Sequence, residues 1–201
     1  MKDRNSKYNF GKYVYPDRWV SYWYQINEVL RFNPNNVLII GKGDGIIIDI
    51  LKQFIPEVKT LDIEKNLIPD IVASVDSIPL EDNSYDIVLC AEVLEHLPFE
   101  RFERSLFEIN RVCRKGAVIS LPHFGPPVKF LLKVPFLKEI KIHFKIPYPR
   151  PHKFNGEHYW EIGKIKYSQD KIRKIISKYF VIKKEFVPFE NQYHHFYILE
   201  K

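Results

Sequence analysis

The segment Val37–Ile48, V-L-I-I-G-K-G-D-G-I-I-I, constrains the fold more than any other, because three glycines alternate with charged residues between two aliphatic runs. The apolar run 37–40 predicts a short buried strand. The run 46–54 predicts a helix that ends near Pro56, which cannot continue it. Glycine permits backbone dihedrals that let a loop approach a ligand closely. The segment therefore predicts a strand, a ligand-binding loop and a helix in succession.

The rest of the chain continues this alternation of strands and helices. Helical or strand periodicity predicts helices over 17–32, 100–112 and 168–178, and strands over 58–62, 70–74, 85–91, 115–121, 180–186 and 193–200. Such alternation indicates an α/β fold whose sheet is mostly parallel, with helices on both faces. The last two strands are separated only by 187–192, so the last strand is expected to be antiparallel. Ligands of such sheets bind at the carboxyl ends of the strands.

Length and composition indicate one folded domain, 1–201. With 45% hydrophobic and 28% charged residues, the 201-residue chain is long enough for a single core. No apolar run is long enough to span a membrane, and no apolar signal core follows the first seven residues, which favours a cytoplasmic protein. Cys90 and Cys113 suit a reducing compartment and are interpreted as two small buried hydrophobic residues.

The positive charge of the chain is local. Residues 122–166 hold nine Lys or Arg against three Asp or Glu, a surplus equal to the net charge of +6. We interpret this segment as a basic aromatic insert, a lid that contributes to an acceptor site, and 1–33 as an N-terminal helical cover. The insert suits a lid, a membrane-surface face or a cover over an anionic acceptor. A lid that packs its Phe and Leu on the domain is favoured. Within it, His158, Tyr159 and Trp160 are equally candidates for acceptor contacts and for structural anchors.

The glycine pattern narrows the class of ligand. A dinucleotide fingerprint needs its third glycine at position 46, which is Ile46, and no G-K-[ST] follows to make a phosphate loop. A G-x-G-x-G loop with an acid ending the second strand, Asp62, resembles class I S-adenosylmethionine-dependent methyltransferases of the type 11-like family. The resemblance covers Val37–Leu121 and includes D-I-V-A-S-V-D-S-I-P-L, Y-D-I-V-L-C-A-E-V-L-E-H-L and R-V-C-R-K-G.

The resemblance implies a Rossmann-like methyltransferase sheet that binds S-adenosyl-L-methionine. Asp62 would accept both ribose hydroxyls, since a carboxylate has two acceptor oxygens, and Gly41 and Gly43 would let the methionine part lie against the backbone. Asp76 is favoured over Ser74 for the adenine amino group. The remaining implied cofactor contacts are Lys42, Asp44, Gly45, Ile63, Val75, Cys90 and Ala91. The family's usual acid before the loop is replaced by Ile39, and Asp44 is a candidate to compensate.

Acidic and histidine side chains supply the catalytic candidates. Glu92, Glu95 and His96 would share a face if the segment is helical, and their spacing resembles the metal-assisted ubiquinone-pathway O-methyltransferases. The favoured alternative is that Glu95 and His96 only cap and orient the loop, with no metal. His96, Glu92 and His123 are the predicted catalytic residues. For His123, which follows the strand 115–121, a loop histidine bonded to backbone is an equal alternative.

These features favour a methyltransferase that acts on an oxygen or nitrogen of a small-molecule acceptor. Three alternatives remain open. An RNA methyltransferase would explain the basic aromatic insert, although no separate RNA-binding module is evident. An aminopropyltransferase-like enzyme would explain G-K-G-D-G, which resembles the loop of spermidine synthases. A non-catalytic cofactor-binding protein would explain Ile39 and Ser74 where the family prefers acids.

Overall fold

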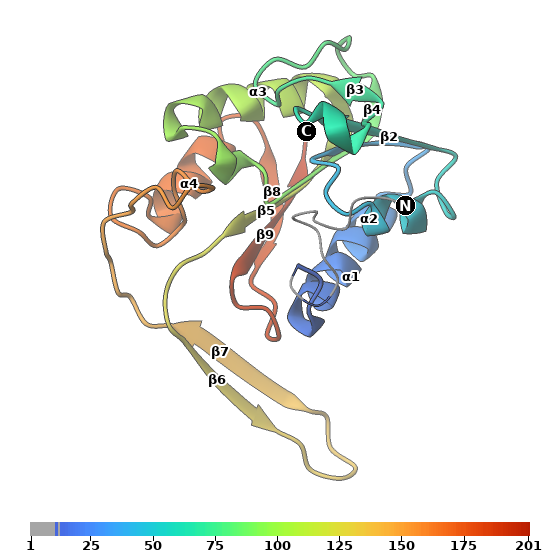
Figure 1. Cartoon of the computed structure of the whole chain (residues 1–201). Coiled ribbons are helices and arrows are strands. Elements are labelled where there is room, and N and C mark those ends of the chain that lie inside the picture. The colour runs from blue at the N-terminus through green and yellow to red at the C-terminus, as the bar shows by residue number, and fades with distance from the viewer. Residues whose placement is uncertain (1–10, 12) are drawn as a thin grey trace.

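A seven-stranded sheet forms the centre of the protein (Figure 1). The computed structural model describes residues 11 and 13–201. The strand order is β3-β2-β1-β4-β5-β9-β8. The strands are β1 (Asn36–Ile40), β2 (Glu57–Asp62), β3 (Ile71–Val72), β4 (Tyr85–Ala91), β5 (Cys113–Pro122), β8 (Val181–Phe186) and β9 (His194–Glu200).

The direction of the strands follows the prediction. Strands β1 to β5 pair in parallel, and β9 runs antiparallel to both β5 and β8. The mostly parallel sheet with an antiparallel last strand is therefore confirmed. The chain runs outward from β1 through β2 to β3 and then returns to β4 on the other side of β1. This reversal creates a crevice at the carboxyl ends of β1 and β4, where ligands of open α/β sheets bind.

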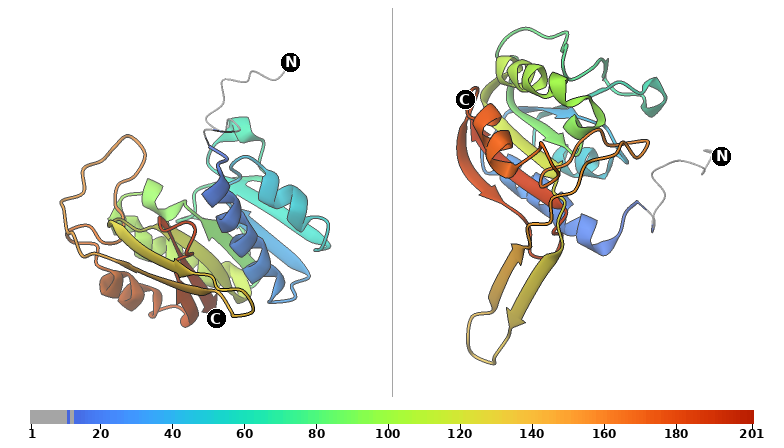
Figure 2. Two further views of the ribbon diagram at one scale, coloured as in Figure 1. Left: turned by 90° about the horizontal axis from the view of Figure 1, so that it is seen from below. Right: turned by 90° about the vertical axis from the view of Figure 1, so that its left-hand side faces the viewer.

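Helices cover both faces of the sheet (Figure 2). On one face lie α1 (Pro16–Leu30) and α2 (Ile46–Leu51), and on the other α3 (Phe102–Val112) and α4 (Gln169–Ile176). Three single-turn helices, η1 (Lys65–Leu67), η2 (Leu94–His96) and η3 (Phe99–Arg101), lie in the loops. Because side chains of a strand alternate between faces, Leu38 and Ile40 of β1 join the α3–α4 core, whereas Val37 and Ile39 join the α1–α2 core.

The two tryptophans of α1, Trp19 and Trp23, do not belong to the core. Their exposed fractions are 42% and 57%. The helix instead buries Ser21, Tyr22, Gln25, Glu28 and Val29. Polar contacts from separate elements fix this rotation: Asn191 donates to Ser21 Oγ at 3.0 Å, and Lys184 reaches Glu28 Oε1 at 2.6 Å. Of the predicted cover 1–33, residues 1–10 and 12 lie outside the described part of the chain.

The basic segment 122–166 contains a hairpin that projects from the body, as Figure 1 and the right-hand view of Figure 2 show. Its strands, β6 (Pro127–Leu132) and β7 (Ile140–Lys145), form a separate two-stranded sheet by pairing with each other. All of the large hydrophobic side chains of the hairpin strands are exposed, so the expected packing of its Phe and Leu on the domain is wrong for this part of the insert. Within the described residues, none of the helices combines the length and apolar character needed to cross a bilayer.

Candidate functional site

A cavity of about 710 Å³ lies at the carboxyl ends of β1, β2 and β4. Its walls come from four parts of the chain: the glycine loop 41–44, helix α1 with the residues before it, the loop after β4, and segments 154–159 and 193–194. These parts are far apart in sequence and meet where the strand order reverses. The cavity therefore occupies the position at which the sequence analysis placed a ligand.

The glycine loop has a backbone that other residues would strain. Gly41 has φ +85°, and a Cβ there would lie 2.5 Å from Val93 Cγ2. Gly45, at φ +87°, precedes the first residue of α2. Asp44 is held at both oxygens, since it accepts the Ile46 N–H at 3.0 Å and the Tyr22 hydroxyl at 2.5 Å. Asp44 thus fastens the loop to α1.

Asp62 ends β2 and lines the cavity. Its carboxylate accepts the backbone N–H of Lys42 at 2.7 Å and that of Glu64 at 2.9 Å. A carboxylate has about four lone-pair positions, so two remain for hydroxyl donors of a ligand. The glycine loop and the carboxylate are joined directly by the bond to Lys42, which couples the two parts of the predicted cofactor site.

The loop after β3 contributes Ser74 and Val75 to the cavity wall, whereas Asp76 is not among the lining residues. Asp76 instead accepts the Ser74 hydroxyl at 2.5 Å and pairs with Arg101 at 3.2 Å. Asp76 is therefore placed to orient Ser74, and its preferred role as an adenine contact stays a prediction. Of the other predicted contacts, the cavity wall includes Lys42, Gly43, Ile63 and Ala91 and does not include Gly45 and Cys90.

Two carboxyl groups follow β4 within the cavity wall: Glu95 is buried, and the side chain of Glu92 is 14% exposed. Glu92 has φ +54°, which turns the chain out of the strand. Its Oε1 accepts the Ser120 hydroxyl at 2.9 Å, and its Oε2 lies 3.7 Å from His194 Nε2. Burial raises the pKa of Glu92 to about 7, against the opposing effect of the Ser120 bond. Glu95 is fully buried, and burial followed by the charge of Glu92 raises its pKa well above the ordinary value.

A cluster of polar rings faces these carboxyl groups. His158 Nε2 lies 3.9 Å from Glu95 Oε1, and its ring lies 5.0 Å from that of His96. On its other side, His158 Nδ1 lies 3.2 Å from Glu161 Oε1, which also accepts the Tyr193 hydroxyl at 2.8 Å. The cavity beside Glu92 is thus lined by groups that can donate to or accept from a polar ligand.

The structure alters the set of residues that a divalent ion would meet. Donor atoms of Glu95, His96 and His158 all lie within 4.8 Å of one another, whereas Glu92 is not part of this group. The segment after β4 forms only the single turn η2, so Glu92 does not share a helical face with Glu95 and His96. That Glu95 and His96 cap and orient the loop, rather than bind a metal, stays a prediction.

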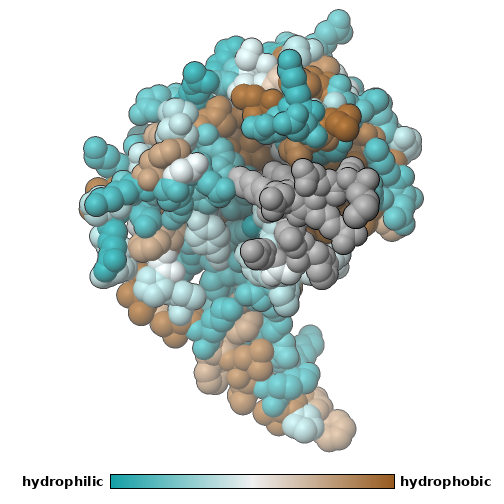
Figure 3. Space-filling model, in the orientation of Figure 1, coloured by the Kyte–Doolittle hydropathy of each residue, from teal (hydrophilic) through white to brown (hydrophobic). Residues whose placement is uncertain are grey.

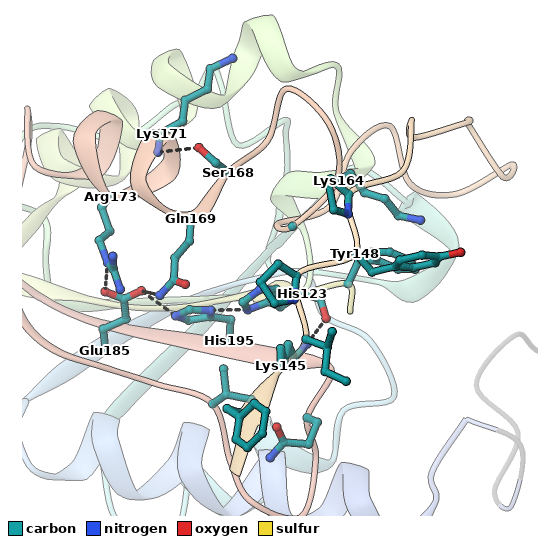
Figure 4. Close-up of a pocket in the computed structure, with 18 of the residues that line it drawn as sticks. His123, Lys145, Tyr148, Lys164, Ser168, Gln169, Lys171, Arg173, Glu185 and His195 are labelled. Atoms are coloured by element: carbon teal, nitrogen blue, oxygen red, sulfur yellow. Dashed lines mark hydrogen bonds and ion pairs between the residues drawn. The ribbon is translucent and has the colours of Figure 1, made fainter. Parts of the chain in front are cut away.

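His123 lines a different cavity, of about 930 Å³, beside the root of the hairpin (Figure 4). Its Nδ1 lies 2.8 Å from His195 Nδ1, and His195 Nε2 lies 2.7 Å from Glu185. Burial, followed by the charge of Lys145, lowers the pKa of His123 to about 3, so the ring is neutral. His123 is not among the residues that line the cavity of the glycine loop, and its catalytic role stays a prediction.

Several residues of the cavity were missed by sequence reasoning. Arg18, Tyr22, Tyr193 and His194 all line it. The last two stand at the start of an apolar strand pattern, and nothing local marks them as functional. The aromatic residues of the insert were equally candidates for structural anchors and for acceptor contacts. Trp160 is an anchor, since it is fully buried against Phe99 and Phe102. His158 and Tyr159 instead line the cavity.

The bond between Tyr22 and Asp44 yields a first prediction. The change Tyr22→Phe removes the hydroxyl that holds the glycine loop against α1, and hydrogen bonds to charged groups contribute about 1.5–3 kcal/mol. We expect the affinity for S-adenosylmethionine, measured by calorimetry, to fall about tenfold, which corresponds to the lower end of this range. The matched control is Tyr24→Phe on the same helix, whose ring packs on Phe186 and Phe196. Equal affinities of the two variants would contradict the role of the bond.

Comparison with known proteins agrees with this geometry. Residues 38–121 match the family model described as a methyltransferase domain. A curated relative, an uncharacterized protein from Methanocaldococcus jannaschii, is 35% identical over 91 residues, which are 41% of this chain and 38% of the relative. The aligned part of the chain thus spans well under half of that relative.

Two solved structures share the fold. The N-methyltransferase NodS from Bradyrhizobium japonicum, in complex with S-adenosylhomocysteine, has a TM-score of 0.66 at 9% identity, over 98% of this chain and 93% of that chain. A second is the 1,6-didemethyltoxoflavin-N1-methyltransferase from Burkholderia thailandensis, with bound 1,6-didemethyltoxoflavin and S-adenosylhomocysteine. Its TM-score is 0.61 at 14% identity, over 92% of this chain and 81% of that chain.

The sheet order and the loop after β1 define the class I methyltransferase fold. Residues 38–121, which hold the glycine loop, Asp62 and Glu92, match the methyltransferase domain model. The predicted resemblance is therefore confirmed, and the prediction of an S-adenosylmethionine-dependent enzyme agrees with these matches.

Proposed function

We propose that the protein transfers the methyl group of S-adenosylmethionine to an oxygen or nitrogen atom of a small-molecule acceptor. The observation that carries this proposal is that a half-buried carboxyl group, Glu92, lines the same cavity as Asp62 and the glycine loop. One cavity thus combines groups suited to the cofactor with a group suited to remove a proton from an acceptor. The 1,6-didemethyltoxoflavin-N1-methyltransferase, which shares the fold and holds a small molecule, supports an acceptor of small size.

The residues present suit the cofactor. Asp62 has free acceptor positions for ribose hydroxyls, and the apolar side chains Ile63, Val75 and Leu89 line the same cavity, which suits a planar base. A Cβ built on Gly43 would meet no atom within 4 Å, so the loop leaves open space beside its backbone. When bound, S-adenosylmethionine would supply an electrophilic methyl group.

The chain itself would position the acceptor and take its proton. Methyl transfer needs alignment of the two reacting atoms, and it needs a base where the acceptor begins protonated. Glu92 would accept that proton, and the bond from Ser120 holds its carboxylate in place. Tyr193 and His158 would hold polar groups of the acceptor, because both face the cavity and are themselves fixed by Glu161.

Two lysines of the basic hairpin, Lys129 and Lys141, are engaged within the protein and do not support RNA as the acceptor. Phosphate recognition needs free Lys and Arg side chains. Lys141 instead pairs with Glu190 at 2.7 Å, and Lys129 donates to the Glu190 carbonyl at 3.1 Å. These two lysines are directed to the body of the protein.

Tritium transfer from labelled S-adenosylmethionine tests the proposal. The purified chain is incubated with cell extract, which is then separated into RNA, protein, lipid and small metabolites. We expect label in a small-molecule fraction, either polar or lipid-soluble, and none with the variant Asp62→Ala. Label in RNA or protein would overturn the choice of acceptor. Tight calorimetric binding without any transfer would favour a non-catalytic cofactor-binding protein.

A further inference from the structure

The β6–β7 hairpin has two chemically distinct faces. Opposed residues of an antiparallel pair point to the same side, and successive residues alternate. The register pairs Val128 with Phe144, Phe130 with Ile142, and Leu132 with Ile140, so one side carries six hydrophobic residues. We call these six the apolar face. The opposite side, the basic face, carries Pro127, Lys129, Leu131, Lys141, His143 and Lys145.

The basic face is turned toward the body of the protein. Lys141 pairs with Glu190, and the Nζ atoms of Lys129 and Lys141 lie 5.4 and 5.5 Å from the centre of the Phe189 ring. The ring of His143 lies 5.9 Å from that of Phe189. Nearer the root, Lys145 donates to the His123 carbonyl. The contacts of Lys129, Lys141 and His143 with the loop between β8 and β9, and that of Lys145 with the residue after β5, direct the apolar face away from the body.

The apolar face is open to solvent. Its six side chains are between 39% and 57% exposed. At the tip of the hairpin, Leu137 is 64% exposed and Phe136 is completely exposed. Figure 3 shows hydrophobic residues along the projecting hairpin. A contiguous apolar surface of this kind marks an interaction site.

The charge of the hairpin distinguishes between the possible occupants of this surface. Residues 127–146 contain five lysines and one glutamate, a surplus of four positive charges. Two copies packed through their apolar faces would bring both surpluses together, and like charges across an interface are unfavourable. Lys133 and Lys138, which flank the tip, are exposed. An anionic lipid surface would attract these lysines while its acyl boundary buries the apolar side chains.

We propose that the β6–β7 hairpin docks the protein on anionic lipid bilayers by inserting its apolar face and tip at the interface. The flanking lysines contact lipid headgroups, and the basic face remains bound to Glu190 and Phe189. The docking is peripheral and needs neither cofactor nor methyl transfer. Its failure is therefore distinguishable from failure of the proposed enzymatic activity.

Flotation with lipid vesicles tests the docking. The full chain is mixed with vesicles of phosphatidylcholine alone or of phosphatidylcholine and phosphatidylglycerol in equal parts. We expect binding to the anionic vesicles that weakens with added salt, and at least tenfold less binding to the neutral ones. The double change Phe130→Ser with Ile142→Ser should reduce binding at least tenfold. Lys133→Glu with Lys138→Glu should remove the preference for anionic lipid.

The matched control is Phe54→Ser, which removes a side chain that is 62% exposed on the body and should leave vesicle binding unchanged. Calorimetry with S-adenosylmethionine reports whether each variant is folded, since the hairpin strands lie outside the cavity of the glycine loop. The proposal is overturned if the unaltered chain does not float with anionic vesicles, or if the Phe130→Ser, Ile142→Ser variant floats equally well. It is also overturned if sedimentation finds a dimer that this variant dissociates.

Discussion

Replacing Asp62 with alanine is expected to weaken the binding of S-adenosylmethionine roughly a hundredfold, which corresponds to about 3 kcal/mol. Two effects act in the same direction. The change removes the only acidic side chain that ends β2, and so the acceptor predicted for the ribose hydroxyls. It also leaves the N–H groups of Lys42 and Glu64 without the carboxylate that orients them. Calorimetric titration of the purified chain measures the affinity.

Two further variants show whether a loss of affinity comes from the loss of the Asp62 carboxylate. Asp62→Asn keeps one acceptor oxygen and should show an intermediate affinity. Asp49→Ala removes an exposed acid from α2, outside the cavity wall, and should bind as the unaltered chain does. If Asp62→Ala binds within threefold of the unaltered chain, the cavity is not the cofactor site. A general loss of structure would instead appear as a lowered melting temperature, which separates the two explanations.

The sheet was predictable because each strand carries its own local signal. The apolar runs of β1 and β4 are flanked by turn residues, and the short connection before β9 implies its antiparallel direction. The hairpin also carries such a signal, since I-K-I-H-F-K alternates with period two. That pattern indicates a two-faced strand, but it does not reveal whether the apolar side packs on the domain or faces solvent.

The site was predictable only where its residues lie at the carboxyl ends of predicted strands. Asp62 ends β2 and Glu92 follows β4, the two strands that flank β1, so their approach to the glycine loop follows from the topology. His158 and Tyr193 reach the same cavity through contacts between distant segments, such as the bond between Tyr193 and Glu161. His123 is a residue that the sequence placed near the site and that the structure places elsewhere. It follows β5 at the expected edge of the sheet, yet its contact with His195 directs it into another cavity.

The change Glu92→Gln is expected to lower turnover between a hundredfold and ten-thousandfold, the usual contribution of a general base. The pH dependence follows from the pKa of Glu92, which burial raises to about 7. The carboxylate accepts a proton only when it is ionised, so activity should rise with pH through about 7 and be lost below it. The variant should lose this rise while its affinity for S-adenosylmethionine stays within about twofold.

A folding defect would give a different result from the loss of a base. A carboxyl group whose pKa is raised in the folded state contributes stability at low pH and loses it as pH rises through the folded pKa. The Glu92→Gln variant should therefore be at least as stable as the unaltered chain at pH values above about 7. The control Glu28→Gln removes a buried carboxylate of α1 that pairs with Lys184, outside the cavity wall. It should lower the melting temperature and leave the pH profile of turnover unchanged, whereas an unchanged profile in Glu92→Gln would exclude Glu92 as the base.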